Sequence, residues 1–356
     1  MELAPRRFWQ DRPVLVTGHS GFIGSWLALA LQQLGARVSG LALPPPTDPA
    51  HFVAARVGEG MTHHVGDVRR AEVVDAILAE AKPEIVFHLA AQPLVRTAWV
   101  DPLTTFGTNV MGTLNVLDAV RRSPHPRAVA VYTTDKVYAN REWPWPYREI
   151  DALGGSEPYG ASKAAAEHVV EAYRRTYFAD PARPVGLAAL RAGNVIGGGD
   201  WAADRLVPDA VRAFAAGDSL LIRHPSAVRP WQHVLEPVGA TLLLARLLLE
   251  KPDLAAQAWN IGPDDGEARP VSWVADRLVT LWPGAKPWHS SEQQGPYEAN
   301  HLTLDNSKAH FELGWRPGWT LERALQQTVA WYHAFYRGDD AAALSRRQIG
   351  EYFDEP

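Results

Sequence analysis

The sequence contains no cysteine among its 356 residues, which excludes disulfides, zinc ribbons, iron–sulfur clusters and thiol catalysis. It also has no fixed-period repeat, no low-complexity tract and no long apolar run. The most apolar stretch, residues 240–249, includes Arg246 and is far shorter than the roughly 20 residues of a membrane span. Residues 1–10 lack the apolar segment of a signal peptide, so we expect a cytoplasmic protein that does not enter a membrane.

Charge of either sign is not in excess, with 35 Lys and Arg against 40 Asp and Glu and a formal charge of −5. A mildly acidic chain has no general attraction for nucleic acid or anionic membranes, so we expect neither as a partner. Hydrophobic residues make up 46% of the chain, as in ordinary globular proteins. A chain of this length is expected to form about two domains with a core that needs no disulfide or metal for stability.

Short apolar runs alternate with helix-like stretches through the first half of the sequence. Continuous apolar strands separated by helices are typical of βαβ units and of a parallel sheet covered on both faces. We therefore predict an α/β fold, a Rossmann-type doubly wound parallel sheet with a smaller C-terminal substrate-binding domain. The predicted strands are residues 13–18, 37–43, 61–67, 84–90, 128–134 and 185–191, and the predicted helices are residues 22–34, 73–81, 105–122 and 159–178.

The regular alternation ends near residue 191. Gly197-Gly198-Gly199 interrupts the chain, and prolines and tryptophans are scattered through residues 200–320. We predict a Rossmann domain at residues 1–190 and a mixed α/β substrate domain at residues 191–356, with some strands or helices interleaved between the two. Residues 140–158 show no periodicity and are expected to form a loop near the strand ends.

Three glycines follow the first predicted strand. Gly18, Gly21 and Gly24 are spaced by three residues in the segment Thr17-Gly-His-Ser-Gly-Phe-Ile-Gly24. In a strand–turn–helix unit the first glycine allows a tight turn, the second lets a pyrophosphate approach the backbone, and the third lets the helix pack closely on the sheet. The free amide groups and the dipole of the helix N-terminus then favour phosphate. The segment therefore predicts a dinucleotide-binding loop.

A second pattern lies where the fifth strand ends and the next long helix begins. Tyr159 and Lys163 are four residues apart, so they share one face of a helix. A tyrosine with an ordinary pKa of about 10 is a poor base at neutral pH, but a neighbouring ammonium can lower that pKa. Thr134 and Asp135 follow the fifth strand, at the edge where doubly wound sheets bind ligands. We expect Thr134 to hydrogen-bond the reacting hydroxyl, and Asp135 indicates an additional proton transfer.

Together these motifs resemble the nucleotide-sugar 4,6-dehydratases of the extended short-chain dehydrogenase/reductase superfamily, and most closely the members that act on CDP-glucose. The resemblance extends over essentially the whole chain, from about residue 8 onward. Its further segments are Phe8-Trp-Gln10, Ala90-Ala-Gln-Pro-Leu-Val-Arg96, Thr134-Asp-Lys136, Arg141-Glu-Trp143, Arg191-Ala-Gly-Asn-Val-Ile-Gly-Gly-Gly-Asp-Trp201 and Arg229-Pro-Trp-Gln-His-Val234.

The resemblance implies NAD as the cofactor, with Asp67 near the adenine amino group. Related proteins often hold the ribose with an acid after the second strand, but residues 41–46 contain none. No basic cluster stands there for a 2′-phosphate either, which favours NAD but leaves NADP open. The expected cofactor-binding residues are Gly18, Gly21, Phe22, Ile23, Gly24, Asp67, Val68, Ala90, Ala91, Gln92, Tyr159 and Lys163.

The resemblance also implies a lyase that converts CDP-glucose to CDP-4-keto-6-deoxyglucose and water. Tyr159 accepts the 4-hydroxyl proton while a hydride leaves C4, water is lost across C5–C6 with Asp135 as the acid, and the hydride returns to C6. Many relatives have Glu as the C5 base where this sequence has Lys136. Lys136 must be neutral to be that base, which burial near Lys163 would favour; otherwise it acts through water or stabilises the enolate. The expected catalytic residues are Thr134, Asp135, Lys136, Tyr159 and Lys163.

The substrate diphosphate needs cations, and the planar guanidinium groups of Arg205 and Arg229 suit phosphate. By resemblance, Asn194 lies near the phosphates or the sugar, and Thr134 also contacts substrate. No histidine or carboxylate spacing predicts a metal site. The resemblance further implies a homodimer through a four-helix bundle of residues 105–122 and 159–178, with a higher oligomer open. Small residues there, Ala164, Ala165 and Ala166, would permit close approach.

Three other functions are open at this point: an NAD-dependent nucleotide-sugar epimerase, a 4,6-dehydratase for another nucleotide sugar, and a non-catalytic NAD-sensing protein. Asp135 argues against an epimerase, because epimerisation at C4 needs no acid for a leaving group. The complete set of Thr134, Tyr159 and Lys163 argues against a non-catalytic protein. Nothing in the residue chemistry distinguishes cytidine from uridine, thymidine or guanosine.

Overall fold

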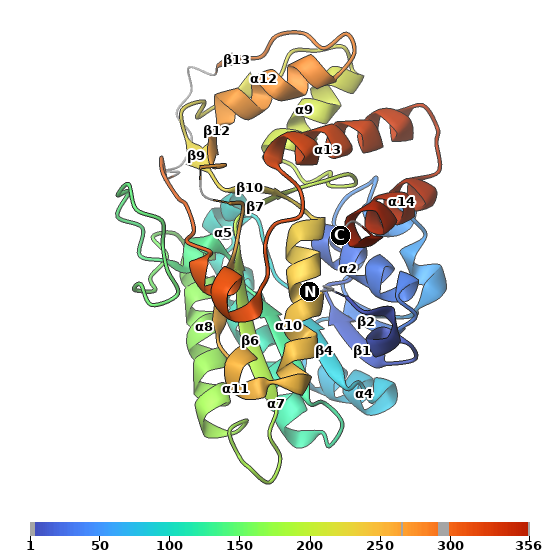
Figure 1. Cartoon of the computed structure of the whole chain (residues 1–356), viewed down its shortest axis with the longest axis vertical. Helices are drawn as coiled ribbons and strands as arrows, with labels where there is room; N and C mark the ends of the chain where they lie inside the picture. Colours follow the sequence, from blue (N-terminus) through green and yellow to red (C-terminus); the bar gives the residue numbers. More distant parts are fainter. Residues whose placement is uncertain (1–3, 265, 291–298, 355–356) are drawn as a thin grey trace.

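The central element of the protein is a seven-stranded parallel sheet, seen in a computed structural model that describes residues 4–264, 266–290 and 299–354 (Figure 1). The strand order β11-β6-β5-β4-β1-β2-β3 reverses direction between β1 and β4, as in doubly wound folds. The predicted α/β fold is therefore confirmed. The strands are β1 (Pro13–Thr17), β2 (Arg37–Ala42), β3 (Thr62–Val65), β4 (Ile85–His88), β5 (Ala128–Tyr132), β6 (Gly186–Ala192) and β11 (Ala258–Ile261).

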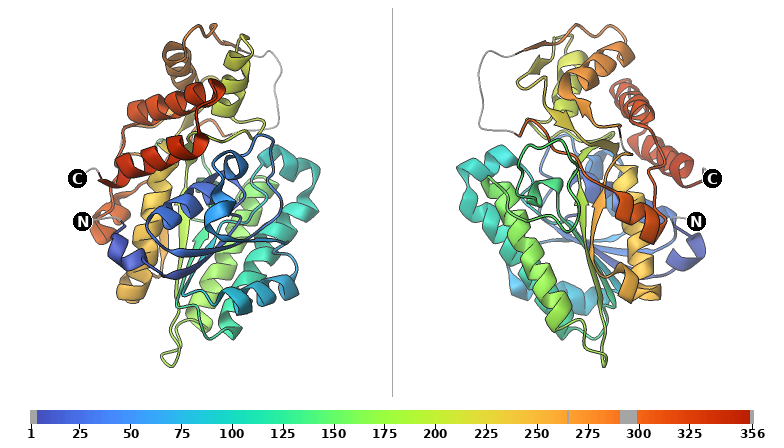
Figure 2. Two further views of the ribbon diagram at one scale, coloured as in Figure 1. Left: turned by 90° about the vertical axis from the view of Figure 1, so that its right-hand side faces the viewer. Right: turned by 60° about the vertical axis from the view of Figure 1, so that its left-hand side comes forward.

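Helices cover both faces of this sheet, which Figure 2 shows from two further sides. Side chains alternate between the faces: Leu15 of β1 joins one core cluster, while Val14 and Val16 join the other. The inner strands β1, β4, β5 and β6 are shielded from water on both faces and are mostly apolar, as the sequence pattern predicts, whereas the edge strand β3 is largely exposed. One face packs against α4 (Ala71–Ala81), α7 (Gly112–Arg122) and α8 (Pro158–Thr176). The other packs against α2 (Phe22–Gln33) and α10 (Leu235–Glu250), on which α14 (Ala341–Asp354) lies.

The predicted helix over residues 105–122 is interrupted. It consists of α6 (Pro102–Phe106), a π-helical turn η2 (Gly107–Met111) and α7. Single π-helical turns occur frequently at functional sites. The shorter helical segments elsewhere are α1 (Arg6–Trp9), α3 (His51–Ala54), η1 (Val57–Gly60), α5 (Val95–Val100), η3 (Asp135–Val137), α11 (Pro252–Ala255) and η4 (Ala309–Leu313).

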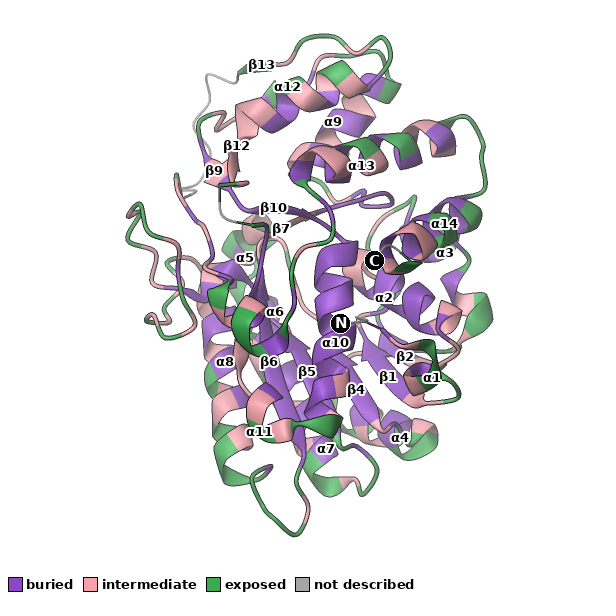
Figure 3. Ribbon diagram, in the orientation of Figure 1, coloured by how far each residue is buried: buried purple, intermediate pink, exposed green. Residues whose placement is uncertain are grey.

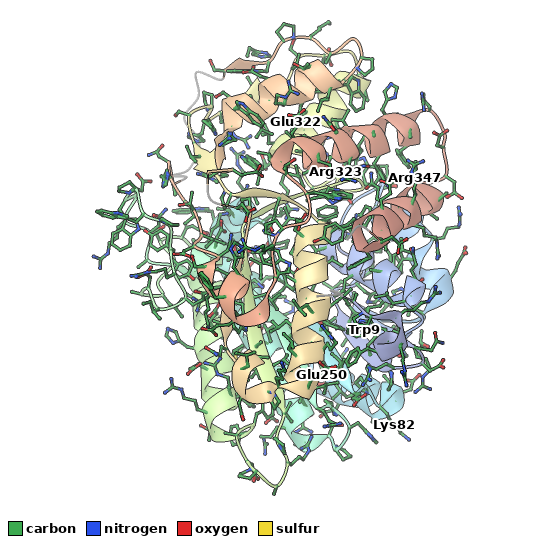
Figure 4. All side chains as sticks on the ribbon, in the orientation of Figure 1. Trp9, Lys82, Glu250, Glu322, Arg323 and Arg347 are labelled. Carbon is green, nitrogen blue, oxygen red and sulfur yellow. The ribbon has the colours of Figure 1, made fainter. Side chains whose placement is uncertain are left out.

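A smaller part of the chain lies beyond the carboxyl ends of the central strands (Figure 1). An ion pair there joins Arg277 of α12 (Val271–Leu281) to Glu322 of α13 (Leu321–Tyr336); Glu322 is labelled in Figure 4. Three short two-stranded sheets pair β7 (Asn194–Ile196) with β10 (Trp231–His233), β9 (Val228–Arg229) with β12 (Arg269–Pro270), and β8 (Leu221–Ile222) with β13 (His289–Ser290). The helices are α9 (Leu206–Ala215), α12 (Val271–Leu281) and α13 (Leu321–Tyr336).

Strand β11 and helix α10, both from the C-terminal half, belong to the large sheet layer. Strand β11 pairs with β6, and α10, buried along most of its length (Figure 3), packs on β5 and β6. The domain boundary at residue 190 stays a prediction, and β11 and α10 are elements from after this boundary that pack in the large sheet layer. Within the described residues, no helix is both long enough and apolar enough to cross a membrane.

Candidate active site

A cavity of about 390 Å³ lies at the carboxyl ends of the central strands, bordered on its other side by the smaller part of the chain. Doubly wound sheets bind ligands at this edge. The cavity brings together residues that the sequence predicted for three different tasks. Those lining it are Phe22, Ile23, Thr134, Asp135, Lys136, Tyr159, Asn194, Arg205 and Arg229; the other predicted residues lie outside its lining.

The glycine loop has the geometry predicted for a dinucleotide site. Gly18 has a φ of +78°, and a Cβ there would lie 2.6 Å from the backbone nitrogen of Ala90. A Cβ on Gly24 would lie 2.2 Å from the carbonyl oxygen of Gly18, so the first turn of α2 packs directly on the loop. At Gly21 the nearest atom would be 3.4 Å away, which leaves the backbone open for a phosphate.

A histidine pair lies beside β2. His19 Nε2 is 2.6 Å from His63 Nδ1, and a Cβ on Gly40 of β2 would lie 2.4 Å from His19 Nδ1. Burial and the neighbouring His63 lower the pKa of His19 to about 4. The carboxylate of Asp67 accepts hydrogen bonds from Arg69 at 2.6 to 2.9 Å, and these lower its pKa. Val68 is buried against Gly112.

The segment Ala90–Gln92 is fixed by Asn109 of the π-helical turn. Gln92 N donates to Asn109 Oδ1 (2.8 Å), and Asn109 Nδ2 donates to Gln92 O (3.1 Å) and Ser162 Oγ (2.9 Å). Since Ser162 lies between Tyr159 and Lys163 on α8, this one asparagine links the predicted cofactor segment to the predicted catalytic helix. The Gln92 side chain bonds to Thr105 and Leu94, so it supports the segment rather than the cavity.

Tyr159 is positioned by the first turn of α8. Glu157 caps the helix, accepting hydrogen bonds from Tyr159 N (2.7 Å) and Gly160 N (2.6 Å), and Pro158 occupies the first helical position. Burial raises the pKa of the Tyr159 phenol to about 12, although a hydrogen bond with Thr134 and the charge of Arg205 oppose this change. Tyr159 is therefore a neutral phenol in the protein alone.

Lys163 is buried on the same helix. Its Nζ donates to the carbonyl oxygen of Tyr132 (2.9 Å), and burial lowers its pKa to about 8, with Glu167 acting in the opposite direction. Burial has the largest effect on the Tyr159 pKa and Arg205 lowers it, while the lowering of that pKa by Lys163 stays a prediction. The helical spacing does place both side chains at the same edge of the sheet.

Thr134, Asp135 and Lys136 form the floor of the cavity at the end of β5. Thr134 Oγ1 donates to Asp135 Oδ1 (3.0 Å), while Asp135 Oδ2 is buried with no hydrogen-bond partner. Lys136 Nζ lies 3.9 Å from Asp135 Oδ1, and 35% of its side chain is exposed. The Lys136 side chain is therefore only partly buried and lies beside the carboxyl group of Asp135.

A buried network lies directly beneath this floor. Thr133 Oγ1 donates to Glu167 Oε1 (2.6 Å), and Glu167 forms a two-pronged ion pair with Arg191 of β6. Arg191 also donates to the Tyr138 hydroxyl (2.9 Å), which donates to Asn260 of β11 (2.6 Å). The network therefore ties β5, β6, β11 and α8 together immediately behind the predicted catalytic side chains.

The predicted phosphate-binding arginines approach the cavity from the smaller part. Arg205 donates to Asp200 Oδ2 (2.8 Å), and Arg229 is buried and donates to the carbonyl oxygen of Val228 (2.9 Å). The side-chain oxygen of Asn194 is buried without a hydrogen-bond partner. An unsatisfied buried oxygen beside a cavity is available to a ligand donor.

Residues 14–262 match the NAD dependent epimerase/dehydratase family. The chain belongs to this family. It is 46% identical over 351 residues, covering 98% of both chains, to a CDP-glucose 4,6-dehydratase of Salmonella typhimurium. A solved UDP-glucose 4-epimerase of Thermus thermophilus in complex with NAD is 26% identical, with a TM-score of 0.76, over 91% of this chain and 99% of that one. A solved dTDP-glucose 4,6-dehydratase of Bacillus anthracis in complex with NAD is 24% identical, with a TM-score of 0.74, over 90% of this chain and 96% of that one. This likeness shows the fold.

Several residues at the site of this epimerase/dehydratase family member were not predicted from the sequence. Glu167 is four residues after Lys163, so helical spacing could have placed it on the catalytic face. Glu157 immediately before Pro158 is a recognisable helix start. No local signal identifies Arg96, Asp204 and Arg223, because they meet only in the folded chain.

Proposed function

We propose that this protein is an NAD-dependent CDP-glucose 4,6-dehydratase, a lyase that forms CDP-4-keto-6-deoxyglucose and water. One observation carries the proposal beyond family membership: the buried, unpartnered Asp135 Oδ2 beside Thr134 and Tyr159 in the cavity. A carboxyl group at that place is the acid that elimination of a sugar hydroxyl requires. An epimerase that inverts only C4 has no use for it.

The glycine loop fits NAD, since Gly18 and Gly24 make the close approaches that a dinucleotide site needs and Gly21 leaves the backbone accessible. We propose that Phe22, Ile23, Asp67, Val68 and the segment Ala90–Gln92 complete this site. When bound, NAD supplies one chemistry, accepting a hydride from C4 of the sugar and returning it to C6.

The proposed roles of the chain's own residues follow from their positions. Tyr159 accepts the proton of the 4-hydroxyl, and Thr134 holds that hydroxyl. Lys163 is proposed to lower the phenol pKa from the high value that burial imposes, and the positive charge of a bound nicotinamide would lower this pKa further. Water in the cavity takes the C5 proton, and Asp135 gives its proton to the 6-hydroxyl, which leaves as water. C5 then takes a proton back from the cavity water as C6 receives the hydride, and the proton that Tyr159 took from the 4-hydroxyl restores Asp135 through solvent.

Lys136 is proposed to act as a cation. Its exposed ammonium next to Asp135 is suited to stabilising the negative charge that develops on the C4 oxygen when C5 loses its proton. A Lys136→Met variant is then expected to turn over at least about tenfold more slowly at every pH from 6 to 9. If Lys136 were instead a neutral base, the unaltered enzyme would gain rate steeply with pH over this range.

The function is tested by incubating the protein with NAD and a panel of CDP-, UDP-, dTDP- and GDP-sugars. Formation of a 4-keto-6-deoxy sugar, which absorbs in alkali, is expected with CDP-glucose. A C4 epimer as the product would show an epimerase, and 4-keto product from another sugar alone would show a dehydratase of different specificity. Tyr159→Phe is expected to reduce kcat by at least about 100-fold, since the proton acceptor is lost.

Asp135→Asn separates the steps. The variant is expected to oxidise C4 but to eliminate water at least about 100-fold more slowly, so quenched reactions should contain a 4-keto sugar that retains its 6-hydroxyl. Mass spectrometry of the sugar measures this directly. Asp200→Asn is the matched control, because it removes another cavity carboxylate that is paired with Arg205. Equal loss of oxidation and elimination in Asp135→Asn would contradict the acid role.

We also propose a homodimer through α6, α7 and α8, in the cytoplasm, where the proposed substrate and cofactor are metabolites. Exposed apolar side chains gather on the segment that packs against α8: Trp99, Val100, Leu103, Phe106 and Met111. Of the alanines predicted to approach a partner, Ala164 and Ala166 are buried within the chain itself, which leaves only Ala165 partly exposed.

The dimer has a matched test. Leu103 and Phe311 are both 86% exposed, but only Leu103 lies in the apolar group. Leu103→Glu is expected to give monomers in light scattering, while Phe311→Glu should leave the oligomer unchanged. Identical behaviour of the two variants would count against this interface.

A further inference from the structure

Two arginines from distant parts of the chain meet one carboxylate at the cavity. Arg96 Nη1 and Arg223 Nη1 each lie 3.1 Å from the same oxygen, Oδ1 of Asp204. All three residues line the cavity. None of the three was predicted from the sequence as a site residue.

The three residues come from both sides of the cavity. Arg96 belongs to α5, which follows β4 of the large sheet. Asp204 lies in the turn before α9, and Arg223 follows β8, both in the smaller part. The contact is therefore made where the two parts of the chain face each other across the space that we assign to the substrate.

The backbone at Asp204 adopts an unusual conformation. Its φ of 62° lies in the left-handed region, which side chains other than glycine rarely enter, with Asp and Asn the best tolerated. Residues held in such conformations cluster at ligand-binding sites, where the surrounding fold fixes them. In this conformation the carboxylate contacts both guanidinium groups.

The contact itself is weak enough to be exchanged. Both arginines share one oxygen, and the side chains of Arg96, Asp204 and Arg223 are 39%, 40% and 29% exposed. Ion pairs of this kind add little to stability. A guanidinium has five N–H donors, and neither arginine makes another hydrogen bond or ion pair with a described residue. Most of their donors are thus available to a ligand.

We propose that Arg96 and Arg223 bind the diphosphate of the nucleotide sugar, and that Asp204 is a counter-ion that holds them at the cavity until substrate arrives. This assignment rests on the proposed function. A diphosphate carries more negative charge than one carboxylate and offers oxygens that match the planar guanidinium, so it displaces Asp204. By contrast, Arg205 is held by Asp200, whose side chain is only 6% exposed.

The first test measures binding of CDP by titration calorimetry, which needs no turnover. Arg96→Gln and Arg223→Gln are each expected to weaken CDP at least about tenfold, because each loses a charge-assisted contact to phosphate. Binding of cytidine, which has no phosphate, should stay within about twofold. If both variants bind CDP as tightly as the unaltered protein does, the proposal is wrong. Weaker binding of CDP-glucose alone would then place the two arginines at the sugar instead.

The second test uses Asp204→Asn, which keeps a residue tolerant of the left-handed backbone and removes the charge. As the competing carboxylate is gone, CDP is expected to bind as tightly as before or up to about threefold more tightly. Weaker binding would make Asp204 a structural support and overturn its role as a counter-ion. Asp340→Asn is the control, since Asp340 pairs with Arg56 at similar exposure (47% and 50%) but lies outside the cavity lining.

The outcomes separate this proposal from the proposed function. An unaltered protein that binds CDP but leaves CDP-glucose unchanged would refute the dehydratase and leave the arginine pair testable by the same titrations. Melting temperatures of all variants within about 2 °C of the unaltered protein would show that binding changes do not arise from unfolding.

Discussion

Among the arginine–carboxylate contacts near the cavity, the one beneath its floor and the one at its edge differ in the properties that decide the strength of an ion pair. The side chains of Glu167 and Arg191 are each 4% exposed and meet through two hydrogen bonds, with Thr133 and Tyr138 satisfying further atoms. Asp204 offers one shared oxygen to Arg96 and Arg223, and all three side chains are at least 29% exposed.

The difference shows how one cavity can hold its catalytic side chains rigidly while the ion pair at its edge can exchange its carboxylate for a ligand. A buried charge cannot lose its partner without a large cost, so Glu167 and Arg191 hold β5, β6 and α8 in one arrangement. An exposed, single-oxygen pair can be broken by a competing anion at little cost. The four predictions below test this contrast, from the largest expected effect to the smallest.

Breaking the buried pair should have the largest effect. Arg191→Met leaves the Glu167 carboxylate buried without its cation, and we expect the free energy of unfolding to fall by about 3–5 kcal/mol. Urea unfolding measures the loss. A loss below about 1 kcal/mol would mean that the floor of the cavity is far more adaptable than its burial indicates.

Glu236 is a buried carboxylate with no cationic partner among the described residues, so it shows what burial does to a carboxylate when no arginine is paired with it. Glu236 accepts hydrogen bonds from Gly318 N, Trp319 N and the Tyr352 hydroxyl, and burial raises its pKa to about 7 from an ordinary 4.5. Between these values the folded state binds more protons than the unfolded state, so stability falls as the pH rises from about 4.5 to 7.

Glu236→Gln removes this titration. Relative to the unaltered protein, the variant should therefore gain about 2 kcal/mol of stability between pH 5 and pH 8. Unfolding at the two pH values provides the measurement. An unchanged difference between the two proteins would show that Glu236 keeps an ordinary pKa in the folded chain.

Replacing both partners of the buried pair tests whether the charges themselves are needed. Glu167→Leu combined with Arg191→Met leaves no uncompensated charge, so we expect a stability within about 1–2 kcal/mol of the unaltered protein. The same urea unfolding applies. If the double variant is as unstable as Arg191→Met alone, the loss of stability comes from the missing packing and hydrogen bonds of the arginine. It would then not come from the unpaired carboxylate of Glu167.

The exposed contact should give the smallest change. Asp204→Asn is expected to alter the free energy of unfolding by less than about 0.5 kcal/mol, as is Asp340→Asn. A loss of 2 kcal/mol or more at Asp204 alone would make the edge contact as structural as the floor.

Most of the large sheet could be predicted from the sequence, because strands buried on both faces are apolar along their length. Five of its strands lie within the predicted runs, and β6 extends one residue beyond its run. The seventh, β11, has only the residues Ala258-Trp-Asn-Ile261, and its pairing with β6 depends on the fold of everything between them. Residues 105–122, predicted as a single helix, include a π-helical turn at Gly107–Met111 that the amino-acid composition does not indicate.

The site could be predicted where its members are close in sequence. Gly18–Gly24, Thr134–Lys136 and Tyr159–Lys163 are local motifs, and the structure brings them to the same edge of the sheet. Properties that depend on surroundings were not predictable: the exposure of Lys136, the inward-facing Ala164 and Ala166, and the burial that raises the pKa of Tyr159. The meeting of residues 96, 204 and 223 is purely tertiary.

The late arrival of β11 has a consequence for biosynthesis. Strand β6 ends at Ala192, but the strand that covers its outer edge begins only at Ala258. At roughly 5–20 residues per second, a ribosome leaves that edge uncovered for several seconds. An exposed strand edge is a template for association with other chains. Nascent chains, and fragments that end near residue 190, are therefore expected to be the forms most prone to aggregate and to engage chaperones.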